Sequence, residues 1–206
     1  MTAELFAFKS PLSKGAILAD EVGLGKTIEA GIILSELWAE YKRCILIVVP
    51  ASLRSQWNIE LMEKFFLPSI ILENDSYNEI KSKGKNPFDD CKNIIICSYN
   101  FVVKHAVELQ LIKWDLVVFD EAHKLRNVYK KGNVIGNTMM HTFRHNKKVL
   151  LTATPLQNNL KELYGLISII DQHFFSTVDS FNEQYNTITT RDTAKYGELK
   201  SRLSHI

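Results

Sequence analysis

The chain has 206 residues, of which 46% are hydrophobic and 23% are charged, a composition that excludes a disordered tail and a fibrous repeat. It carries 25 Lys and Arg against 23 Asp and Glu, so the net charge is only +2. This charge excludes a strongly basic protein that coats nucleic acid, although a local basic groove is compatible with it. The length suits one sizeable domain, or at most two small ones.

The apolar runs, such as residues 45–49 and 116–119, are far too short to cross a bilayer. The N-terminus lacks the charged and then apolar pattern of an export signal. The three cysteines, Cys44, Cys91 and Cys97, are an odd number without a CxxC pair, which favours reduced thiols. These features predict a cytoplasmic protein without a membrane partner, and they are compatible with association with the nucleoid.

Short apolar runs rich in β-branched residues alternate along the chain with longer segments of helical spacing. Continuous runs of this kind are typical of strands that are covered on both faces. We expect strands at residues 16–19, 44–49, 70–72, 93–97, 116–119 and 148–151. The repeated alternation predicts an α/β fold, in which helices flank a parallel sheet and the crossovers are right-handed.

Two of the expected helices have apolar residues at helical spacing. The residues of these stripes are Ile28, Ile32, Leu34 and Leu37 in residues 27–40, and Trp57, Leu61 and Phe65 in residues 53–66. Trp57 is therefore interpreted as a core residue rather than a binding residue.

Two segments differ from this alternation. Residues 74–92 are poor in apolar residues and are expected to form a surface loop. After Asp171 no further strand is predicted, and the aromatic residues suggest a helical appendage over residues 172–206 whose packing partner lies outside this chain.

A glycine-containing turn joins the first expected strand to the first expected helix. It comprises Asp20, Glu21, Gly23, Leu24, Gly25, Lys26 and Thr27. The glycines allow backbone N–H groups to point inward, and the helix N-terminus adds positive potential. Lys26 would reach the β- and γ-phosphates of ATP and the Thr27 hydroxyl would ligate Mg²⁺. The general pattern has a glycine in place of Asp20, and the alternative is a simple turn with a solvated lysine.

An acidic pair, Asp120 and Glu121, follows the apolar strand at residues 116–119. Ligands bind at the carboxyl ends of strands in open α/β sheets. Asp120 is therefore expected to hold Mg²⁺, directly or through water, and Glu121 to orient or deprotonate an attacking water. The alternative is a helix N-cap formed by Asp120 beside an exposed Glu121.

A third polar segment, with Thr152 and Thr154, follows the strand at residues 148–151. Its two hydroxyl groups could couple changes at the metal site to a nucleic-acid surface. A β-turn at Pro155 is the alternative, and for this segment alone it is the better interpretation.

Together these segments resemble the Swi/Snf-type DNA translocases of helicase superfamily two. The resemblance rests on four motifs in order: ADEVGLGKT at residues 19–27, VVPASL at 48–53 followed by Gln56 and Trp57, the DEAH motif at 120–123, and LTATPLQN at 151–158. It covers about residues 15–171. Ala153, together with the sequence Glu29-Ala30-Gly31, resembles the bacterial and archaeal branch that includes the RNA-polymerase-recycling translocase RapA.

The resemblance implies a RecA-like P-loop NTPase lobe that uses ATP and Mg²⁺, with Lys26, Asp120 and Glu121 as catalytic residues. His123, Thr152 and Thr154 would couple the nucleotide site to the nucleic acid. The expected nucleic-acid contacts are Pro50, Ser52, Leu53 and Ser98, on a wet and locally basic surface helped by Arg54 and Lys104. Such contacts to phosphates carry no sequence information.

The resemblance also implies a division into a lobe at residues 1–171 and a helical extension at 172–206. The motors of this family have a second RecA-like lobe, which nothing in this sequence resembles, so we expect a fragment with weak or no ATPase activity by itself. The expected partners are double-stranded DNA, the second lobe, and a nucleoprotein or RNA polymerase. The alternatives are an RNA helicase, a restriction-system motor subunit, and a nucleotide- or partner-binding module without turnover.

Overall fold

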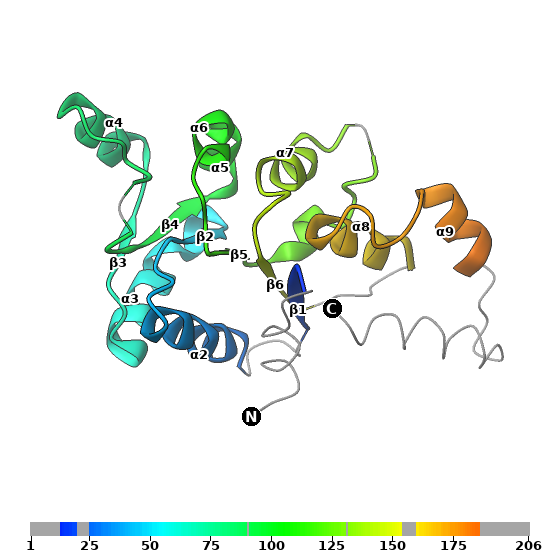
Figure 1. Cartoon of the computed structure of the whole chain (residues 1–206), viewed down its shortest axis with the longest axis horizontal. Coiled ribbons are helices and arrows are strands. Elements are labelled where there is room, and N and C mark those ends of the chain that lie inside the picture. The colour runs from blue at the N-terminus through cyan, green and yellow to red at the C-terminus, as the bar shows by residue number, and fades with distance from the viewer. Residues whose placement is uncertain (1–12, 20–24, 90, 131, 154–159, 186–206) are drawn as a thin grey trace.

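The computed structural model describes residues 13–19, 25–89, 91–130, 132–153 and 160–185. Within these residues a parallel sheet of six strands forms the centre of the molecule (Figure 1). The strands are β1 (Gly15–Ala19), β2 (Ile45–Val49), β3 (Ser69–Ile71), β4 (Ile94–Ser98), β5 (Leu116–Phe119) and β6 (Lys148–Thr152). Their order is β1-β6-β5-β2-β4-β3, and every neighbouring pair is parallel. The predicted α/β class and all six predicted strands are confirmed.

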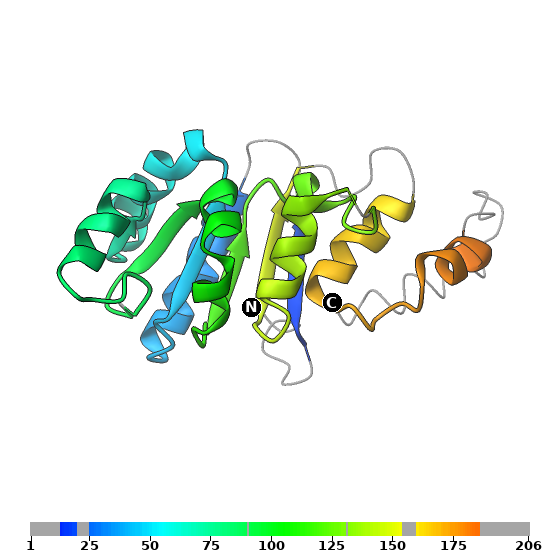
Figure 2. The ribbon, with the colours of Figure 1, turned by 90° about the horizontal axis from the view of Figure 1, so that it is seen from above.

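Helices cover both faces of the sheet (Figures 1 and 2). One face carries α2 (Lys26–Ala39) and α3 (Arg54–Phe65), with the short 3₁₀ helix η1 (Ala51–Leu53) before α3. The other face carries α4 (Asn74–Ser82), α5 (Tyr99–Lys104), α6 (Ala106–Gln110), α7 (Val134–Thr142) and α8 (Leu160–Ile170). The 3₁₀ helix η2 (Ala122–Leu125) follows β5, and α9 (Val178–Tyr185) packs on the outside of α8.

Alternate residues of each central strand point into separate hydrophobic cores. On β2, Leu46 and Val48 belong to the core beneath α5 to α8, whereas Ile45, Ile47 and Val49 belong to the core beneath α2 and α3. All five are fully buried. Burial on both faces explains why these strands are continuous apolar runs in the sequence.

The buried stripe of α2 differs from the predicted one. Leu34 and Leu37 are buried as expected, but Ile28 and Ile32 are 41% and 47% exposed. The small residue Ala30 is buried instead, and a Cβ on Gly31 would overlap the ring of Phe65 on α3. Ile33, which is as large as Ile32, is buried as well. The inner face of α2 therefore consists of Ala30, Gly31, Ile33, Leu34 and Leu37, and the predicted stripe was wrong at Ile28 and Ile32.

The segment predicted as a surface loop contains a helix, α4, over Asn74–Ser82. Glu73 and Ser76 form a capping box at its N-terminus, in which the Glu73 N–H donates to Ser76 Oγ at 2.9 Å. The inner face of the helix is formed by Tyr77, which is buried, and Ile80, which is partly buried. Uncharged polar and charged residues fill the rest of this short helix, and for this reason its composition resembled that of a loop.

The C-terminal appendage finds its packing partner within the chain. Phe175 and Phe181 are buried against Tyr164 of α8, and Tyr185 packs on Phe175 and Phe181 in the same separate aromatic cluster. The expectation of a partner outside the chain is therefore wrong for residues 172–185. Residues 186–206 lie outside the described residues, and the domain boundary at residue 171 stays a prediction.

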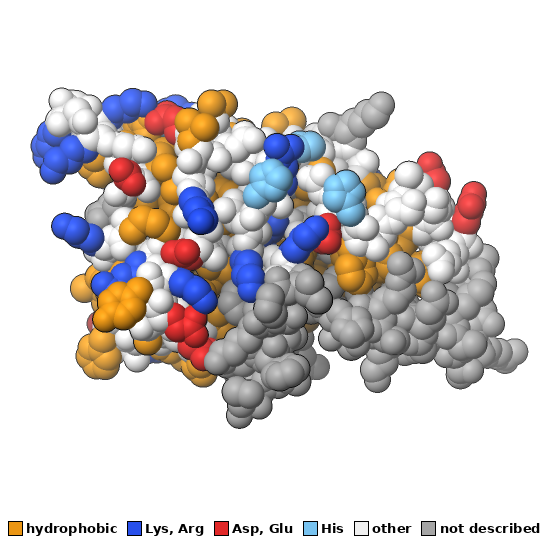
Figure 3. Space-filling view, viewed as in Figure 1, with side chains coloured by type: hydrophobic (Ala, Val, Ile, Leu, Met, Phe, Trp, Pro, Cys, Tyr) orange, Lys and Arg blue, Asp and Glu red, His pale blue; other side chains and the backbone are white. Residues whose placement is uncertain are grey.

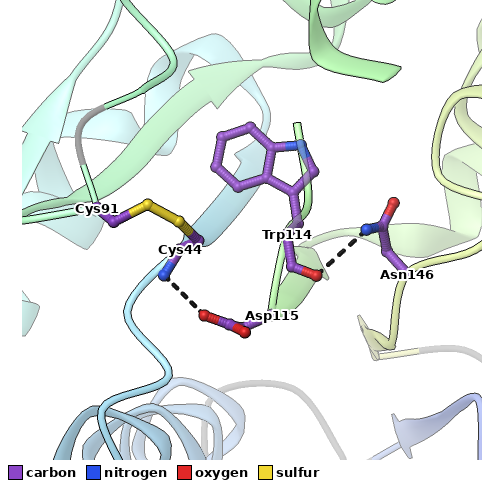
Figure 4. Close-up of a disulfide and its surroundings, with 5 residues drawn as sticks. All are labelled: Cys44, Cys91, Trp114, Asp115 and Asn146. Atoms are coloured by element: carbon purple, nitrogen blue, oxygen red, sulfur yellow. Dashed lines mark hydrogen bonds between the residues drawn. A yellow bond between two sulfur atoms is a disulfide. The ribbon is translucent and has the colours of Figure 1, made fainter. Parts of the chain in front are cut away.

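The prediction of three reduced cysteines is also wrong, because Cys44 and Cys91 are joined by a disulfide (Figure 4). Parallel pairing of β2 with β4 brings residues 47 positions apart in the sequence side by side, so no local spacing could have indicated the pair. Asp115 accepts a hydrogen bond from the Cys44 N–H at 3.0 Å at the same edge of the sheet. Cys97 is a buried thiol whose pKa is raised by burial.

None of the helices in the described ranges combines the length and the apolar character that a bilayer crossing requires.

Lys148, the first residue of β6, is fully buried at the amino edge of the sheet. Its Nζ donates to the carbonyl oxygens of Asn146 and Ile170, at 3.0 and 3.1 Å, and so joins β6 to the end of α8. Burial lowers the pKa of Lys148 to about 8, and the charge of Lys14 lowers it further while Asp171 opposes the change. A neutral amine still has the two donors that these carbonyls require.

We predict that Lys148 makes the stability depend on pH. Its pKa is lower in the folded chain than the ordinary 10.5, so between about pH 8 and 10.5 the unfolded chain binds more protons and stability rises with pH. The free energy of unfolding of the wild type, minus that of Lys148→Met, should increase over this window by up to about 3 kcal/mol, at 1.36 kcal/mol per pKa unit. Urea denaturation between pH 7 and 10 measures it, and a constant difference would contradict the prediction.

Candidate functional site

The sequence-predicted site residues gather at the carboxyl edge of the sheet (Figure 2). This follows from the parallel arrangement, which places the carboxyl ends of all strands at one edge. Those in described positions are Gly25, Lys26 and Thr27 after β1, Pro50, Ser52 and Leu53 after β2, Ser98 at the end of β4, Asp120, Glu121 and His123 after β5, and Thr152 at the end of β6. Asp20, Glu21, Gly23, Leu24 and Thr154 lie outside the described residues.

The first turn of α2 is built to face an anion. Gly25 is its N-cap and offers no side chain to the N–H groups of the turn, and the first backbone hydrogen bond of the helix runs from Glu29 N to Gly25 O at 2.8 Å. Lys26 and Thr27 begin the helix and are partly buried. The N–H groups and the helix dipole therefore give this turn a positive potential.

Asp120 is held in place by hydrogen bonds from three directions. Trp57 on α3 donates its indole N–H to Asp120 Oδ2 at 2.8 Å, and the Glu121 N–H donates to Oδ1 at 2.8 Å. The Tyr99 hydroxyl on α5 donates to the Asp120 carbonyl oxygen at 2.7 Å. The Asp120 N–H continues the sheet by donating to Val48 O on β2. Both the carboxylate and the backbone of Asp120 are thus fixed.

The prediction that Trp57 is a core residue is confirmed, since the side chain is only 3% exposed. Sequence reasoning missed its hydrogen bond to Asp120. A signal was available, because a buried indole N–H usually finds a partner, although the sequence does not say which one. The hydrogen bond from Tyr99 to Asp120 was missed as well.

Burial raises the pKa of Asp120 above its ordinary value, and the nearby charge of Glu121 acts in the same direction. The hydrogen bonds from Trp57 and from the Glu121 amide, together with the charge of Lys26, oppose this rise. Lys26 follows β1 and Asp120 follows β5, so the parallel sheet places both residues at the same edge, where the charge of Lys26 favours the charged form of Asp120. The pKa of Tyr99 is raised well above its ordinary value by burial and then by the charges of Asp120 and Glu121, so its hydroxyl stays protonated and donates.

Glu121 has a left-handed backbone, with φ 52° and ψ 45°, which is uncommon for a residue with a side chain. This conformation turns the chain from β5 into η2. The Glu121 carboxylate lies 3.0 Å from His123 Nδ1, but the nitrogen has no hydrogen bond, so the two groups are in contact without directed geometry. Strained residues of this kind cluster at functional sites.

Thr152 ends β6 beside Ala19 of β1 and is fully buried. It lies between the segment that leads to α2 and the strand that leads to Asp120, as a coupling role requires. Whether it couples stays a prediction.

The segment after β2 is arranged differently from the expected contact surface. Ser52 is exposed, but Leu53 is partly buried and packs into the core beneath α2 and α3. Ser98 caps α5, accepting a hydrogen bond from the Phe101 N–H at 3.2 Å. Ser52 and Ser98 remain candidates for contact through their hydroxyl oxygens, whereas Leu53 can contribute only its backbone.

A hollow of about 410 Å³ lies beside Ser98, and its walls carry charges of both signs. Arg54 pairs with Glu73 at 3.2 Å, and Lys104 donates to Asn74 at 2.8 Å. The expectation of a locally basic surface is therefore wrong for this hollow. Figure 3 shows the opposite side of the molecule, the amino edge of the sheet, where Lys and Arg side chains are also spread among acidic ones.

The acidic segment is supported from behind by α8. Gly165 of α8 lies so close to the backbone of Arg126 that a Cβ would overlap the Arg126 carbonyl oxygen. The Arg126 guanidinium also lies 3.5 Å from the Glu162 carboxylate on the same helix. Only glycine allows α8 to pack this closely against the residues that follow η2.

We predict that Gly165→Ala lowers the free energy of unfolding by about 1–3 kcal/mol, the usual cost of overpacking, because the backbone after η2 must move. Gly132→Ala is the matched control, since a Cβ there meets nothing within 4 Å. Urea denaturation of both variants measures the effect. If the two variants have equal free energies of unfolding, the backbone at Arg126 can move to accept the added Cβ without loss of stability, and the prediction is wrong.

The parallel sheet, the glycine-capped helix and the acidic pair at one edge define a nucleotide-binding lobe of the RecA-like class. The family model for the SNF2-related domain matches residues 5–206, and the chain belongs to this family. The chain is 38% identical over 173 residues to an uncharacterised ATP-dependent helicase, YqhH, of Bacillus subtilis, covering 82% of this chain and 28% of that protein. It is 36% identical to the RNA polymerase-associated protein RapA of Serratia proteamaculans, covering 80% of this chain and 18% of RapA.

The fold is shared with the SWI2/SNF2 ATPase core of Sulfolobus solfataricus, solved in complex with double-stranded DNA. The TM-score is 0.76 at 23% identity, over 98% of this chain and 40% of that one. The predicted Swi/Snf-type resemblance is confirmed, with bacterial RapA proteins among the relatives. The chain spans less than a third of the length of these curated relatives.

Proposed function

We propose that this chain is the ATP-binding first lobe of a two-lobed motor that hydrolyses ATP to move along double-stranded DNA. The observation that carries the proposal is the placement of the α2 N-terminus and the acidic pair at the same edge, with Lys26 close enough to Asp120 to act on its pKa. Membership of the SNF2-related family supports the same function.

Each residue at this edge has a distinct role in the proposal. The first turn of α2 and Lys26 hold the phosphates of ATP, and Glu121 orients the attacking water and accepts its proton. Asp120 stays in a fixed orientation because both of its carboxylate oxygens accept hydrogen bonds. His123, in contact with Glu121, and Thr152 lie where they can pass a change at the nucleotide to the rest of the edge.

The donor set fits Mg²⁺. The Thr27 hydroxyl and the Asp120 carboxylate are hard oxygen ligands, and Mg²⁺ is usually held by one or two such groups together with substrate phosphates. Among the described residues no group of three or more His, Cys, Asp or Glu could hold a metal ion by itself, so the phosphates would complete the site. The metal supplies charge neutralisation of the phosphates.

We predict that Lys26→Ala weakens the binding of Mg²⁺·ATP by at least about tenfold, because a charge-assisted hydrogen bond of about 1.5–3 kcal/mol is lost. Lys85→Ala removes an exposed lysine on the other side of the sheet and should leave the affinity unchanged. Isothermal titration calorimetry measures both variants. If the two variants bind alike, the assignment of the phosphate site fails.

The nucleic acid in this proposal is duplex DNA, which would lie along the segments after β2 and β4. The solved relative in complex with double-stranded DNA supports this choice of substrate. Ser52 is exposed there, and Lys104 lies at the end of α5, on the wall of the hollow beside Ser98. A nucleoprotein or RNA polymerase is a further proposed partner, because relatives are named for association with RNA polymerase.

DNA binding should weaken as salt rises, since contacts to phosphates release counterions. Lys104→Ala should reduce the slope of log K against log[salt] by about 0.9, the loss of one phosphate contact. Lys64→Ala is the control, because Lys64 lies in the last turn of α3 and pairs with Glu60. Fluorescence anisotropy with a short duplex at several salt concentrations measures the slopes, and an affinity independent of salt would favour a protein partner at this edge.

A second RecA-like lobe completes the motor in this proposal. An arginine from that lobe would stabilise the γ-phosphate in the transition state, which is worth about 10³–10⁵ in rate. The 206-residue chain alone should therefore hydrolyse ATP far more slowly than the same chain joined to a second lobe, with and without duplex DNA. Equal rates would contradict the two-lobed proposal. A strand-displacement assay on the longer protein separates a translocase from an RNA helicase.

The cytoplasmic location stays a prediction, which cell fractionation tests.

A further inference from the structure

Both side chains that reach Asp120 come from segments assigned to nucleic-acid contact. Trp57 lies on α3, one turn after Leu53, and α3 follows the 3₁₀ helix that contains Ser52. Tyr99 is the first residue of α5 and directly follows Ser98. The two strands that would present DNA contacts thus each continue into a helix that holds Asp120.

The hydrogen bond donated by the Trp57 indole differs from the one donated by the indole of Trp114, another buried tryptophan among the described residues. Trp114 is 4% exposed and donates to the carbonyl oxygen of Leu109, a backbone group only five residues away. Trp57, at 3% exposed, instead donates to a carboxylate 63 residues away, on a different strand end. Burial requires some partner for an indole N–H, but it does not require this one.

The two hydrogen bonds to the Asp120 carboxylate fix its orientation, in addition to giving its oxygens hydrogen-bond partners. Trp57 occupies Oδ2 and the Glu121 amide occupies Oδ1, so the side chain cannot rotate without breaking one of the two bonds. Tyr99 fixes the carbonyl oxygen of the same residue at 2.7 Å. Each carboxylate oxygen keeps a second lone pair for further ligands.

We propose that Trp57 and Tyr99 are positioning residues that transmit DNA contact at Ser52 and Ser98 to Asp120, and so couple DNA binding to the binding of the magnesium nucleotide. The inference rests on the proposed function. A helix moves as a rigid body over one turn, so a shift of the start of α3 or α5 moves the indole N–H or the phenol hydroxyl, and with it Asp120.

Coupling of this kind is measured as a ratio of affinities, and it is reciprocal between the two ligands. The probes are the Mg²⁺ complex of a non-hydrolysable ATP analogue and a short duplex DNA, both titrated onto the 206-residue chain. For each protein, the dissociation constant of the nucleotide is measured with and without saturating DNA. The wild-type ratio is expected to be about fivefold or more, within the range typical of coupled sites.

Two conservative variants with matched controls test whether Trp57 and Tyr99 transmit DNA contact to Asp120. Trp57→Phe removes the indole N–H, and its control Trp114→Phe makes the same change at an equally buried site. Tyr99→Phe removes only the hydroxyl, and its control is Tyr77→Phe, because Tyr77 is also 5% exposed but donates to Glu108. We expect Trp57→Phe and Tyr99→Phe to bring the affinity ratio close to one while DNA affinity without nucleotide is unchanged. The controls should keep the wild-type ratio.

Each outcome distinguishes the two proposals. If the wild type binds both ligands but shows a ratio of one, or if Trp57→Phe and Tyr99→Phe keep the wild-type ratio, the transmission is overturned and the proposed function stands. If the affinity ratio also falls to one in the control variants, the effect is general destabilisation and the inference fails as well. If the wild type binds neither ligand, the proposed function itself fails. Should Trp57→Phe not fold, Tyr99→Phe decides, since it lacks a single oxygen atom.

Discussion

The pairing of β5 with β2 on one side and β6 on the other is the constraint on which the site depends. Because all three strands are parallel, Asp120 must emerge between the segments that follow β2 and β6. Its own N–H extends the pairing to Val48 O, so the position of its backbone is set by the sheet rather than by a loop. The hydrogen bonds from Trp57 and Tyr99 then set the orientation of the carboxylate and of the carbonyl group at this backbone position.

A half-buried carboxylate is costly, and the surrounding contacts offset part of this cost. Burial favours the neutral form of Asp120, whereas the indole, the Glu121 amide and the charge of Lys26 favour the charged form. The left-handed turn at Glu121 adds backbone strain, which persists only because packing over-determines it. The close approach of α8 at Gly165 is part of that packing. A ligand with positive charge at this edge would remove the remaining penalty on Asp120.

Much of this arrangement could be predicted from the sequence, because buried parallel strands are continuous apolar runs and chemistry in such sheets lies at the carboxyl ends. That reasoning was sufficient for all six strands and for the common edge of Lys26 and Asp120. It could not find Tyr99 or the partner of Trp57, since a hydrogen bond between residues 63 positions apart leaves no local pattern. The Cys44–Cys91 disulfide was missed for the same reason. The stripe of α2 was misjudged because Ile32 and Ile33 are alike in size and hydrophobicity, and only Ile33, with the small residue Ala30, faces the core.

The two edges of the sheet are held together by different chemistry. At the amino edge, the disulfide, the Asp115 hydrogen bond to the Cys44 N–H and the buried Lys148 amine tie strands to each other and to the end of α8. At the carboxyl edge, each carboxylate oxygen of Asp120 keeps a further lone pair, and Gly25 caps α2 without a side chain. Because the disulfide and these hydrogen bonds stabilise the amino edge, the carboxyl edge can keep polar groups available for ligands without loss of the fold.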